Sequence, residues 1–387
     1  MVYMDNHSTT CVDPLVVEAM IPFLSGQYGN PASLTHAFGR RAAEAVEEAR
    51  GHVAELLGAS PREILFTGGA TESVNLALKG TAESYRGRGR RIVTCATEHA
   101  AGLRACETLE RFAYEVVRLG VDARGRVDPE GLRPWLKEGT ILVSVMTANH
   151  EIGTIAPIAE IGALCREHGV FLHTDAAQAA GKIPLDVGRL GADLVSLSAH
   201  KMHGPKGVGA LWVRGGPDGP HLTPLLDGGG QEGGLRAGTL NVPGIVGFGA
   251  AARLARLRMA ADSPRIASLR DRLVEGIRRG CPAAVLNGDP VRRLPQNASI
   301  SFEGMRAAEL ILKMTDIAVS AGSACSSDDG TVSHVLGAIG LPDAMARGTL
   351  RFGLSRLTTE AEVDYTVERV LESLRRTTPL VAAYQEN

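Results

Sequence analysis

Short apolar runs alternate with amphipathic, helix-like segments along the first 260 residues of the chain. Each run is short enough for a buried β-strand, and each ends in polar residues. The runs are Ile64–Phe66, Ile92–Cys95, Ile141–Met146, Val170–Leu172 and the run that starts at Leu194. Strands that alternate with helices predict an α/β fold with a largely parallel sheet covered by helices. Ligands bind outside the carboxyl ends of the strands in such sheets, so we expect the polar residues there to form one site.

Other segments have the spacing of amphipathic helices. Residues Leu15–Leu24 form one helix-like stretch, and Phe38–Leu57 places apolar side chains along one face. The capping box Thr359-Glu-Ala-Glu362 begins the last helix. A helical region runs from Pro243 toward Met259. We expect Ser263-Pro264 to interrupt it, because proline has no amide hydrogen to donate.

The pattern changes near residue 260, where shorter strands such as Ala298–Phe302 replace the alternating units. We therefore expect a large domain at residues 15–260. Residues 1–14 and 261–387 would form a smaller α+β domain. The polar arm Met4–Thr10 is interpreted as a lead-in segment to the first helix.

The composition excludes several classes of function. A chain of 387 residues with 44% hydrophobic and 22% charged residues is an ordinary globular protein that can bury a sizeable core. Its net charge of −2 offers no attraction to nucleic acid or to an anionic membrane. With neither a leader-like N-terminus nor an apolar stretch of membrane-spanning length, a cytoplasmic protein is expected. Six cysteines without CxxC spacing argue against a zinc site or a disulfide framework.

Lys201 follows an apolar run in the turn Ser198-Ala-His-Lys201. A lysine in a loop is more often a solvated surface residue than a functional one. Here its neighbours favour function, because Ser198 and His200 can donate to a phosphate and Asp175 ends another apolar run. An amine, a carboxylate and phosphate donors are what pyridoxal phosphate requires. A glycine-rich turn before Thr71 also opens a helix, although this could be a simple strand-to-helix connection.

Cys325 lies in a segment of small and turn-forming residues, Ser320–Gly330. Such a segment predicts an accessible loop. A reactive thiol needs exposure, which Cys325 would have, whereas Cys95, Cys106 and Cys165 lie in strand-like or helix-like runs. Without the cofactor residues, Cys325 could equally be a dispensable loop cysteine.

Motifs spread over nearly the whole chain resemble the pyridoxal-phosphate-dependent cysteine desulfurases of the class V aminotransferase superfamily, the nitrogen-fixation and iron–sulfur assembly type. These motifs are Met4-Asp-Asn, Gly29-Asn-Pro, Gly69-Ala-Thr71-Glu, Glu98-His99, Glu151-Ile-Gly, His173-Thr-Asp175-Ala-Ala-Gln178, Ser198-Ala-His-Lys201, Arg236-Ala-Gly-Thr239, Gly322-Ser-Ala-Cys325 and Arg351-Phe-Gly-Leu-Ser-Arg356. The resemblance implies a fold type I transferase, with a mostly parallel seven-stranded type of sheet in the large domain and a smaller α+β C-terminal domain.

The resemblance also implies roles for individual residues. Lys201 would form the Schiff base, His99 would stack on the cofactor ring and transfer protons, and Asp175 would contact the pyridinium nitrogen. Gln178 would bind the phenolic oxygen, and Arg351 would bind the substrate carboxylate with help from Asn30. The phosphate would be held by Ala70, Thr71, Ser198, His200 and, from the neighbouring subunit of a homodimer, Thr239.

Three features of the chain depart from the family's usual pattern. The family usually has Asn-Asn-Glu where this chain has Asn149-His150-Glu151, so His150 stands at a position that normally contacts the cofactor. The arm has Ser8 where the family prefers a smaller residue. The chain ends at Asn387, where housekeeping members usually continue with a tail that helps to dock the scaffold protein.

The implied reaction converts L-cysteine to L-alanine and leaves the sulfur as a persulfide on Cys325. The sulfur would then pass to an acceptor protein, either an iron–sulfur scaffold or a thiolation enzyme. The spacing from Cys325 to Ser333-His334 is similar to that of the branch with the longer cysteine loop, which favours cysteine over selenocysteine. The alternatives are a selenocysteine lyase or class V aminotransferase on the same scaffold, and an inert partner of another desulfurase.

Overall fold

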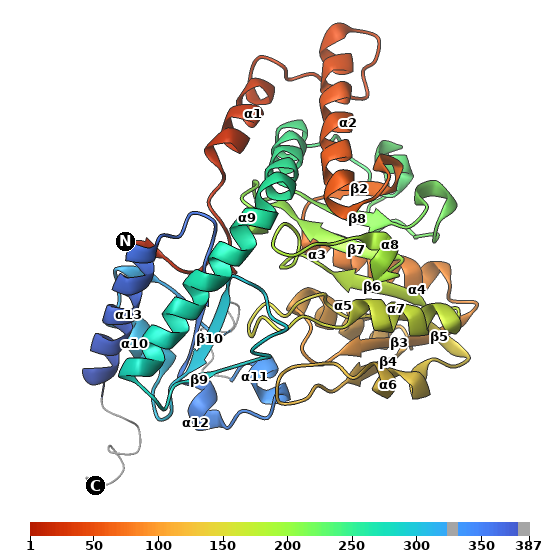
Figure 1. The fold of residues 1–387 in the computed structure, drawn as a ribbon. Helices are drawn as coiled ribbons and strands as arrows, with labels where there is room; N and C mark the ends of the chain where they lie inside the picture. Colours follow the sequence, from red (N-terminus) through yellow and green to blue (C-terminus); the bar gives the residue numbers. More distant parts are fainter. Residues whose placement is uncertain (323–331, 378–387) are drawn as a thin grey trace.

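The computed structural model describes residues 1–322 and 332–377 (Figure 1). The largest sheet in this part of the chain has seven strands, and helices cover it on both faces. In spatial order the strands are β2 (Ile64–Thr67), β8 (Gly209–Val213), β7 (Leu194–Ser198), β6 (Phe171–Asp175), β5 (Gly139–Ser144), β3 (Gly89–Cys95) and β4 (Glu115–Leu119). The helices of this part are α1 (Pro14–Leu24), α2 (Ala37–Leu57), α3 (Ala70–Asn75), α4 (Thr81–Ser84), α5 (Ala100–Arg111), α6 (Pro129–Leu132), α7 (Ile158–Glu167), α8 (Val187–Leu190) and the first half of α9 (Val242–Gly280).

The predicted parallel sheet is confirmed, with β8 as its antiparallel member. The pairs β3–β4, β3–β5, β5–β6 and β6–β7 are parallel, whereas β8 runs antiparallel to both of its neighbours. The chain returns from β7 to β8 through a short turn, residues 199–208, and a direct return of this kind produces an antiparallel pair. Lys201 lies in that turn, at the carboxyl end of β7.

A row of polar side chains crosses the buried centre of the sheet. The imidazole of His173 lies between the hydroxyl of Ser144 on β5, at 2.8 Å from Nδ1, and that of Ser196 on β7, at 2.9 Å from Nε2. All three residues are buried, and burial lowers the pKa of His173 to about 3. The neutral imidazole therefore links three adjacent strands and helps to fix the register that places Asp175 opposite Ser196.

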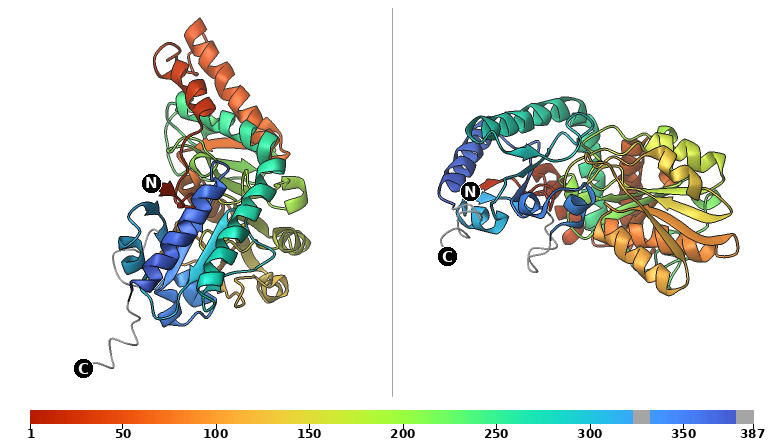
Figure 2. Two further views of the ribbon diagram at one scale, coloured as in Figure 1. Left: turned by 60° about the vertical axis from the view of Figure 1, so that its left-hand side comes forward. Right: turned by 90° about the horizontal axis from the view of Figure 1, so that it is seen from below.

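The remaining elements build a second, smaller layer beside the large sheet (Figure 2). Its four-stranded sheet has the order β12 (Ser320–Ala321), β13 (Thr349–Gly353), β10 (Asn297–Ser301) and β9 (Val285–Leu286), while β1 (Val2–Tyr3) pairs with β11 (Ile317–Ala318). Its helices are α10 (Ala307–Leu312), α11 (His334–Ala338), α12 (Asp343–Ala346) and α13 (Glu360–Arg375). The capping box of α13 is confirmed, since Thr359 Oγ1 accepts from the amide of Glu362 and Glu362 Oε2 accepts from that of Thr359.

The expected interruption at Pro264 is wrong. Helix α9 continues through this residue over 39 residues and is visibly curved (Figure 2). Its first half, with Phe248 and Ala252, packs into the core of the large sheet, and its second half, from Ile266, packs into the core of the smaller one. Burial of both halves outweighs the missing amide bond at Pro264, which costs about 3 kcal/mol in a helix interior. The boundaries of the two domains stay a prediction.

The cysteines in strand-like and helix-like runs are in the core. Cys95, Cys106 and Cys165 are buried, whereas Cys325 lies outside the described part of the chain. Over residues 1–322 and 332–377, no helix combines the length and apolar character needed to cross a bilayer.

Two glycines give a matched test of helix packing. A Cβ at Gly249 on α9 would lie 2.5 Å from the Cα of Ala49 on α2, whereas a Cβ at Gly51 would have no neighbour within 4 Å. We expect Gly249→Ala to lower the free energy of unfolding by about 1–3 kcal/mol through overpacking. Gly51→Ala should raise it by about 0.5–1 kcal/mol through helix propensity. Denaturant midpoints of the two variants measure this, and equal midpoints would contradict the close packing of α2 on α9.

Candidate active site

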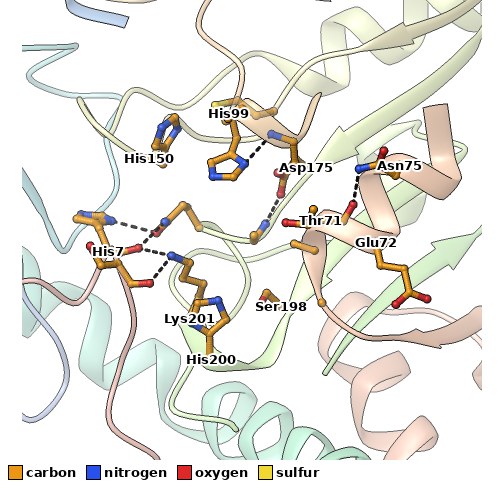
Figure 3. Close-up of a pocket in the computed structure, with 18 of the residues that line it drawn as sticks. His7, Thr71, Glu72, Asn75, His99, His150, Asp175, Ser198, His200 and Lys201 are labelled. Atoms are coloured by element: carbon orange, nitrogen blue, oxygen red, sulfur yellow. Dashed lines mark hydrogen bonds between the residues drawn. The ribbon is translucent and has the colours of Figure 1, made fainter. Parts of the chain in front are cut away.

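A cavity of about 1050 Å³ lies at the carboxyl edge of the large sheet (Figure 3). It is lined by residues from the strand ends, from the N-terminal arm and from the smaller layer. The residues predicted from the sequence that line it are Ala70, Thr71, His99, His150, Asp175, Gln178, Ser198, His200, Lys201 and Arg351. Residues far apart in the sequence thus line one cavity, as expected for polar residues at the strand ends.

Lys201 ends the short 3₁₀ turn Ala199–Lys201 that follows β7. Its ammonium nitrogen donates to the backbone carbonyl of His7 and, at 2.7 Å, to that of Ser8. Both acceptors belong to the N-terminal arm, so the arm forms part of the cavity wall next to the amine.

Asp175 and His99 lie on the opposite side of the cavity from Lys201 (Figure 3). The carboxyl of Asp175 ends β6 and accepts from the amide of Ala177 at 2.9 Å. Burial raises the pKa of Asp175, against the opposing effects of that amide and of the nearby His99 and Lys201 side chains. His99 caps α5, because its Nδ1 accepts from the amide of Ala101 at 3.1 Å. Its Nδ1 is thereby unprotonated, and burial lowers the pKa of His99.

One end of the cavity offers donors to an anion. Ala70 and Thr71 begin α3 after the cap residue Gly69, and the first amide groups of a helix have no partner within the helix. Ser198 is buried at the end of β7, and His200 follows it. Burial, with the nearby charges of Lys201 and Lys206, lowers the pKa of His200 to about 4, so its imidazole is neutral near pH 7. Backbone amides and neutral side-chain donors therefore converge here.

The side chain of Gln178 bonds to His7. Its Oε1 lies 3.0 Å from His7 Nδ1, and its Nε2 donates to the backbone carbonyl of His7 at 3.0 Å. His7 Nε2 lies 3.0 Å from Asn297 Nδ2 on β10. Because the amide oxygen of Gln178 only accepts, His7 Nδ1 carries the proton, and Nε2 accepts from Asn297. Burial lowers the pKa of His7 to about 3, so this neutral imidazole joins the arm to both layers.

Arg351 is buried on β13, where its guanidinium reaches the arm. It donates to Asp5 Oδ1 at 3.2 Å, to Ser8 Oγ at 2.9 Å and to Ser320 Oγ at 3.2 Å. A further bond, at 3.2 Å, goes to the backbone carbonyl of His150. These hydrogen bonds fix the orientation of the Arg351 guanidinium at the border between the two layers.

His150 lines the same side of the cavity as His99 (Figure 3). The two imidazole rings meet edge to face, with their centroids 5.2 Å apart. His150 is 9% exposed, and burial lowers its pKa well below the usual value.

Two of the described residues that were predicted for the site do not line this cavity. Asn30 and Thr239 are exposed and are not among the described residues that line the cavity. Asn30 instead borders a second cavity of about 510 Å³ between α2 and the segment 231–240. Asn30 therefore does not line the cavity of its own chain, and its role beside Arg351 stays a prediction. Another predicted site residue, Cys325, is outside the described part of the chain.

Several residues of the site are not predicted from the sequence. The sequence marks His7 only as part of a lead-in segment and Ser8 as a departure from the family's usual residue, yet they contact Gln178, Lys201 and Arg351. Ser333 was noted only for its distance from Cys325, yet it donates to Glu151 at 2.5 Å. The row of polar residues from Asp5 to Thr10 was the available signal, because such a row serves no purpose in an apolar core.

Comparisons with known proteins show the family to which the chain belongs. The family model described as aminotransferase class-V matches residues 2–366. A cysteine desulfurase IscS from Anaeromyxobacter sp. (strain Fw109-5) is 51% identical over 384 residues, which cover 99% of this chain and 95% of the relative. A cysteine desulfurase from Homo sapiens is 47% identical over 374 residues, which cover 97% of this chain and 82% of the relative.

Solved structures give the same result. A NifS-like protein superimposes with a TM-score of 0.90 at 40% identity and covers 97% of this chain and 100% of its own. A NifS-like protein from Rickettsia africae ESF-5 superimposes with a TM-score of 0.86 at 30% identity, covering 97% and 99%. These relatives favour desulfuration over the alternatives considered from the sequence. The chain belongs to the class V aminotransferase family, and within it the protein is a cysteine desulfurase.

Proposed function

We propose that this desulfurase uses pyridoxal 5'-phosphate, held at Lys201, to convert L-cysteine to L-alanine and to pass the sulfur to Cys325 as a persulfide. The observation that carries the proposal is the meeting of four groups in one cavity: the amine of Lys201, the carboxyl of Asp175, the start of α3 and the guanidinium of Arg351. The amine suits the cofactor's aldehyde, and the carboxyl suits its ring cation. The start of α3 suits the cofactor's phosphate, and the guanidinium suits the carboxylate of the substrate.

The residues fit the cofactor. Lys201 Nζ would bind the aldehyde carbon. Ala70, Thr71, Ser198 and His200 line the part of the cavity with donors suited to the phosphate. Near Asp175, a ring cation would offset the cost of burial, which raises the pKa of this carboxyl. When bound, the cofactor supplies an electron sink for the bonds around the substrate's α-carbon.

The residues around the bound cofactor would have separate roles. Asp175 would keep the ring nitrogen protonated. His99 would stack on the ring and exchange protons through Nε2, because its Nδ1 accepts from Ala101. Gln178 lines the cavity with its amide bonded to His7, and its second Nε2 hydrogen could serve the phenolic oxygen. Arg351 would bind the substrate carboxylate.

Cys325 would accept the sulfur. The carbon–sulfur bond of the substrate breaks as a sulfur–sulfur bond forms on Cys325, and the carbon that loses sulfur takes up a proton to give alanine. The assignment of Cys325 rests on its sequence setting and on the desulfurase relatives.

Replacement of Lys201 or Cys325 tests this function. We expect Cys325→Ala to keep the visible absorbance of the bound cofactor but to form no persulfide and no sulfide from L-cysteine. Lys201→Ala should lose the linkage to the cofactor that borohydride reduces. Absorbance spectra, alanine assays and mass spectrometry of residue 325 are the measurements. Undiminished sulfide release by Cys325→Ala would contradict the assignment.

Replacement of Arg351 tests the carboxylate subsite. We expect Arg351→Gln to lower kcat/KM for L-cysteine by about 10- to 100-fold, because one charged hydrogen bond is worth about 1.5–3 kcal/mol. The loss should lie mainly in KM. Asp5→Asn is the control, since it disturbs the same network without removing the cation. Equal KM values for the wild type and Arg351→Gln would contradict the role.

We also propose a homodimer in which Thr239 of one subunit reaches the phosphate of the other. Helix α1, the segment after it and the first turn of α2 expose several large apolar side chains, which a second subunit could cover. These are Leu15, Val17, Ile21, Leu24, Tyr28, Leu34 and Phe38, with exposed fractions of 42–71%. The exposed positions of Thr239 and Asn30, away from the Lys201 cavity of their own chain, are consistent with use by a partner.

A charge on this apolar face tests the dimer. We expect wild-type protein to sediment as a dimer at micromolar concentration and Ile21→Glu/Leu24→Glu to sediment as a monomer that binds the cofactor less tightly. The matched control is Val291→Glu, which places a charge at an apolar residue 85% exposed on the smaller layer. A monomeric wild-type protein with full activity would overturn the proposal.

The bacterial IscS relatives further support a cytoplasmic enzyme whose sulfur passes to an acceptor protein. We propose an iron–sulfur scaffold or a thiolation enzyme as this acceptor. Mass spectrometry of the Cys325 persulfide, before and after each candidate acceptor is added, would distinguish the two.

A further inference from the structure

The segment 231–239, which ends in Thr239, begins with an unusual backbone conformation. Glu232 has a φ of 49° and a ψ of 43°, and Gly233 and Gly234 follow with φ values of 65° and 82°. Glycine adopts such angles readily, whereas a residue with a side chain rarely does. The conformation of Glu232 therefore needs support from the contacts of its side chain.

The carboxylate of Glu232 is buried and bonds to two elements of the large layer. Its side chain is 2% exposed. Oε1 accepts from Arg50 Nη2 on α2 at 2.7 Å, and Oε2 accepts from Arg50 Nη1 at 2.9 Å. Oε2 also accepts from the amide of Phe66 on β2 at 2.7 Å. Two parallel bonds from one guanidinium are a strong and directional arrangement, so Glu232 is held in one orientation.

Arg50 is itself fixed on both sides. Its Nη1 also donates to the backbone carbonyl of Ile64 at 2.7 Å, and its guanidinium lies 4.7 Å from the centre of the Phe66 ring. Its Nε donates to Glu47 on α2 at 3.0 Å. The guanidinium thus joins α2 to β2, and Glu232 attaches the segment 231–239 to this rigid pair of elements.

Two further bonds carry the constraint along the segment toward Thr239. Gln231 Oε1 accepts from the amide of Gly238 at 3.0 Å, which closes residues 231–238 into a loop. Arg236 Nε donates to Glu72 Oε1 on α3 at 3.0 Å. Thr239 directly follows Gly238 and is exposed. Its position therefore depends on how the segment is attached at Glu232.

We propose that Glu232 is a positioning residue for the cofactor phosphate in the partner subunit. Bonded to Arg50 and Phe66, it holds the segment 231–239 in the conformation that presents Thr239 to the other chain. The inference rests on the proposed function and on its homodimer. Arg50 and Glu232 are not among the described residues that line the Lys201 cavity of their own chain, so their effect on the cofactor is indirect.

The first test compares cofactors with and without a phosphate. In Glu232→Gln the new amide group turns a donor toward Arg50 or Phe66, so the segment loses its attachment. We expect the Kd for pyridoxal 5'-phosphate to rise about 10-fold, the lower end of what a hydrogen bond to a charged group contributes. The Kd for pyridoxal, which has no phosphate, should stay within about twofold. Equal losses for both compounds, or none, would overturn the proposal.

The matched control is Glu47→Gln. Glu47 bonds to the same guanidinium, but its side chain is 63% exposed. It lies on α2, outside the segment 231–239. We expect unchanged affinity for both compounds. Arg50→Lys provides a milder variant if Glu232→Gln does not fold, because an ammonium cannot replace the two-pronged bond, and it should show the same phosphate-specific loss.

The second test uses heterodimers with one intact Lys201 each, purified through two different tags. In the first dimer, Lys201→Ala and Glu232→Gln are on one chain and the other chain is wild type. In the second dimer, one chain has Lys201→Ala and the other has Glu232→Gln. Both dimers contain the same two substitutions, so a general loss of stability is shared. Borohydride reduction after titration with pyridoxal 5'-phosphate measures binding at the intact lysine.

We expect the first dimer to need about 10-fold more cofactor than the second, because its intact lysine faces the altered segment of its partner. Equal binding would overturn the proposal. A weaker second dimer would also overturn it, because the effect would then pass within one chain, through Arg236 and Glu72. If the wild type itself forms no linkage that borohydride reduces, the proposed function fails; if it does and the two dimers bind equally, only the role of Glu232 fails.

Discussion

The parallel pairing of β3, β5, β6 and β7 is the constraint on which the site depends. It brings the carboxyl ends of these strands to one edge, so that His99, His150, Asp175 and Lys201 share a cavity although a hundred residues separate the first from the last. The neutral imidazole of His173 supports this register from inside the sheet. A slip of one strand by one residue would turn its functional side chain to the other face.

The cavity becomes a site because the N-terminal arm and the smaller layer complete it. Arg351 donates hydrogen bonds to the side chains of Asp5 and Ser8, and Lys201 donates to the backbone carbonyls of His7 and Ser8. Burial makes the imidazoles of His7 and His150 neutral and raises the pKa of the carboxyls of Asp175 and Glu151. The guanidinium of Arg351 supplies a fork of N–H donors at this border, which suits an anionic group such as a carboxylate.

Much of the large sheet and most of the candidate site could be predicted from the sequence. The strands are short apolar runs with turn residues after them, and Lys201, Asp175 and His99 each follow such a run. These signals are local, since a buried strand and its exit turn are specified by consecutive residues. The helix caps at Thr359 and at His99 are local in the same way, although the side-chain role of His99 in its cap became visible only in the structure.

The sequence by itself determined the alternation of strands and helices and the residue types at the strand ends. Tertiary structure alone decided that His7 bonds to Gln178, that Ser333 donates to Glu151 across 182 residues of sequence, and that α9 continues through Pro264. It also placed Asn30 and Thr239 away from the cavity of their own chain. The physical reason is that local periodicity encodes which face of an element is buried, whereas contacts between distant segments depend on how the layers pack against each other.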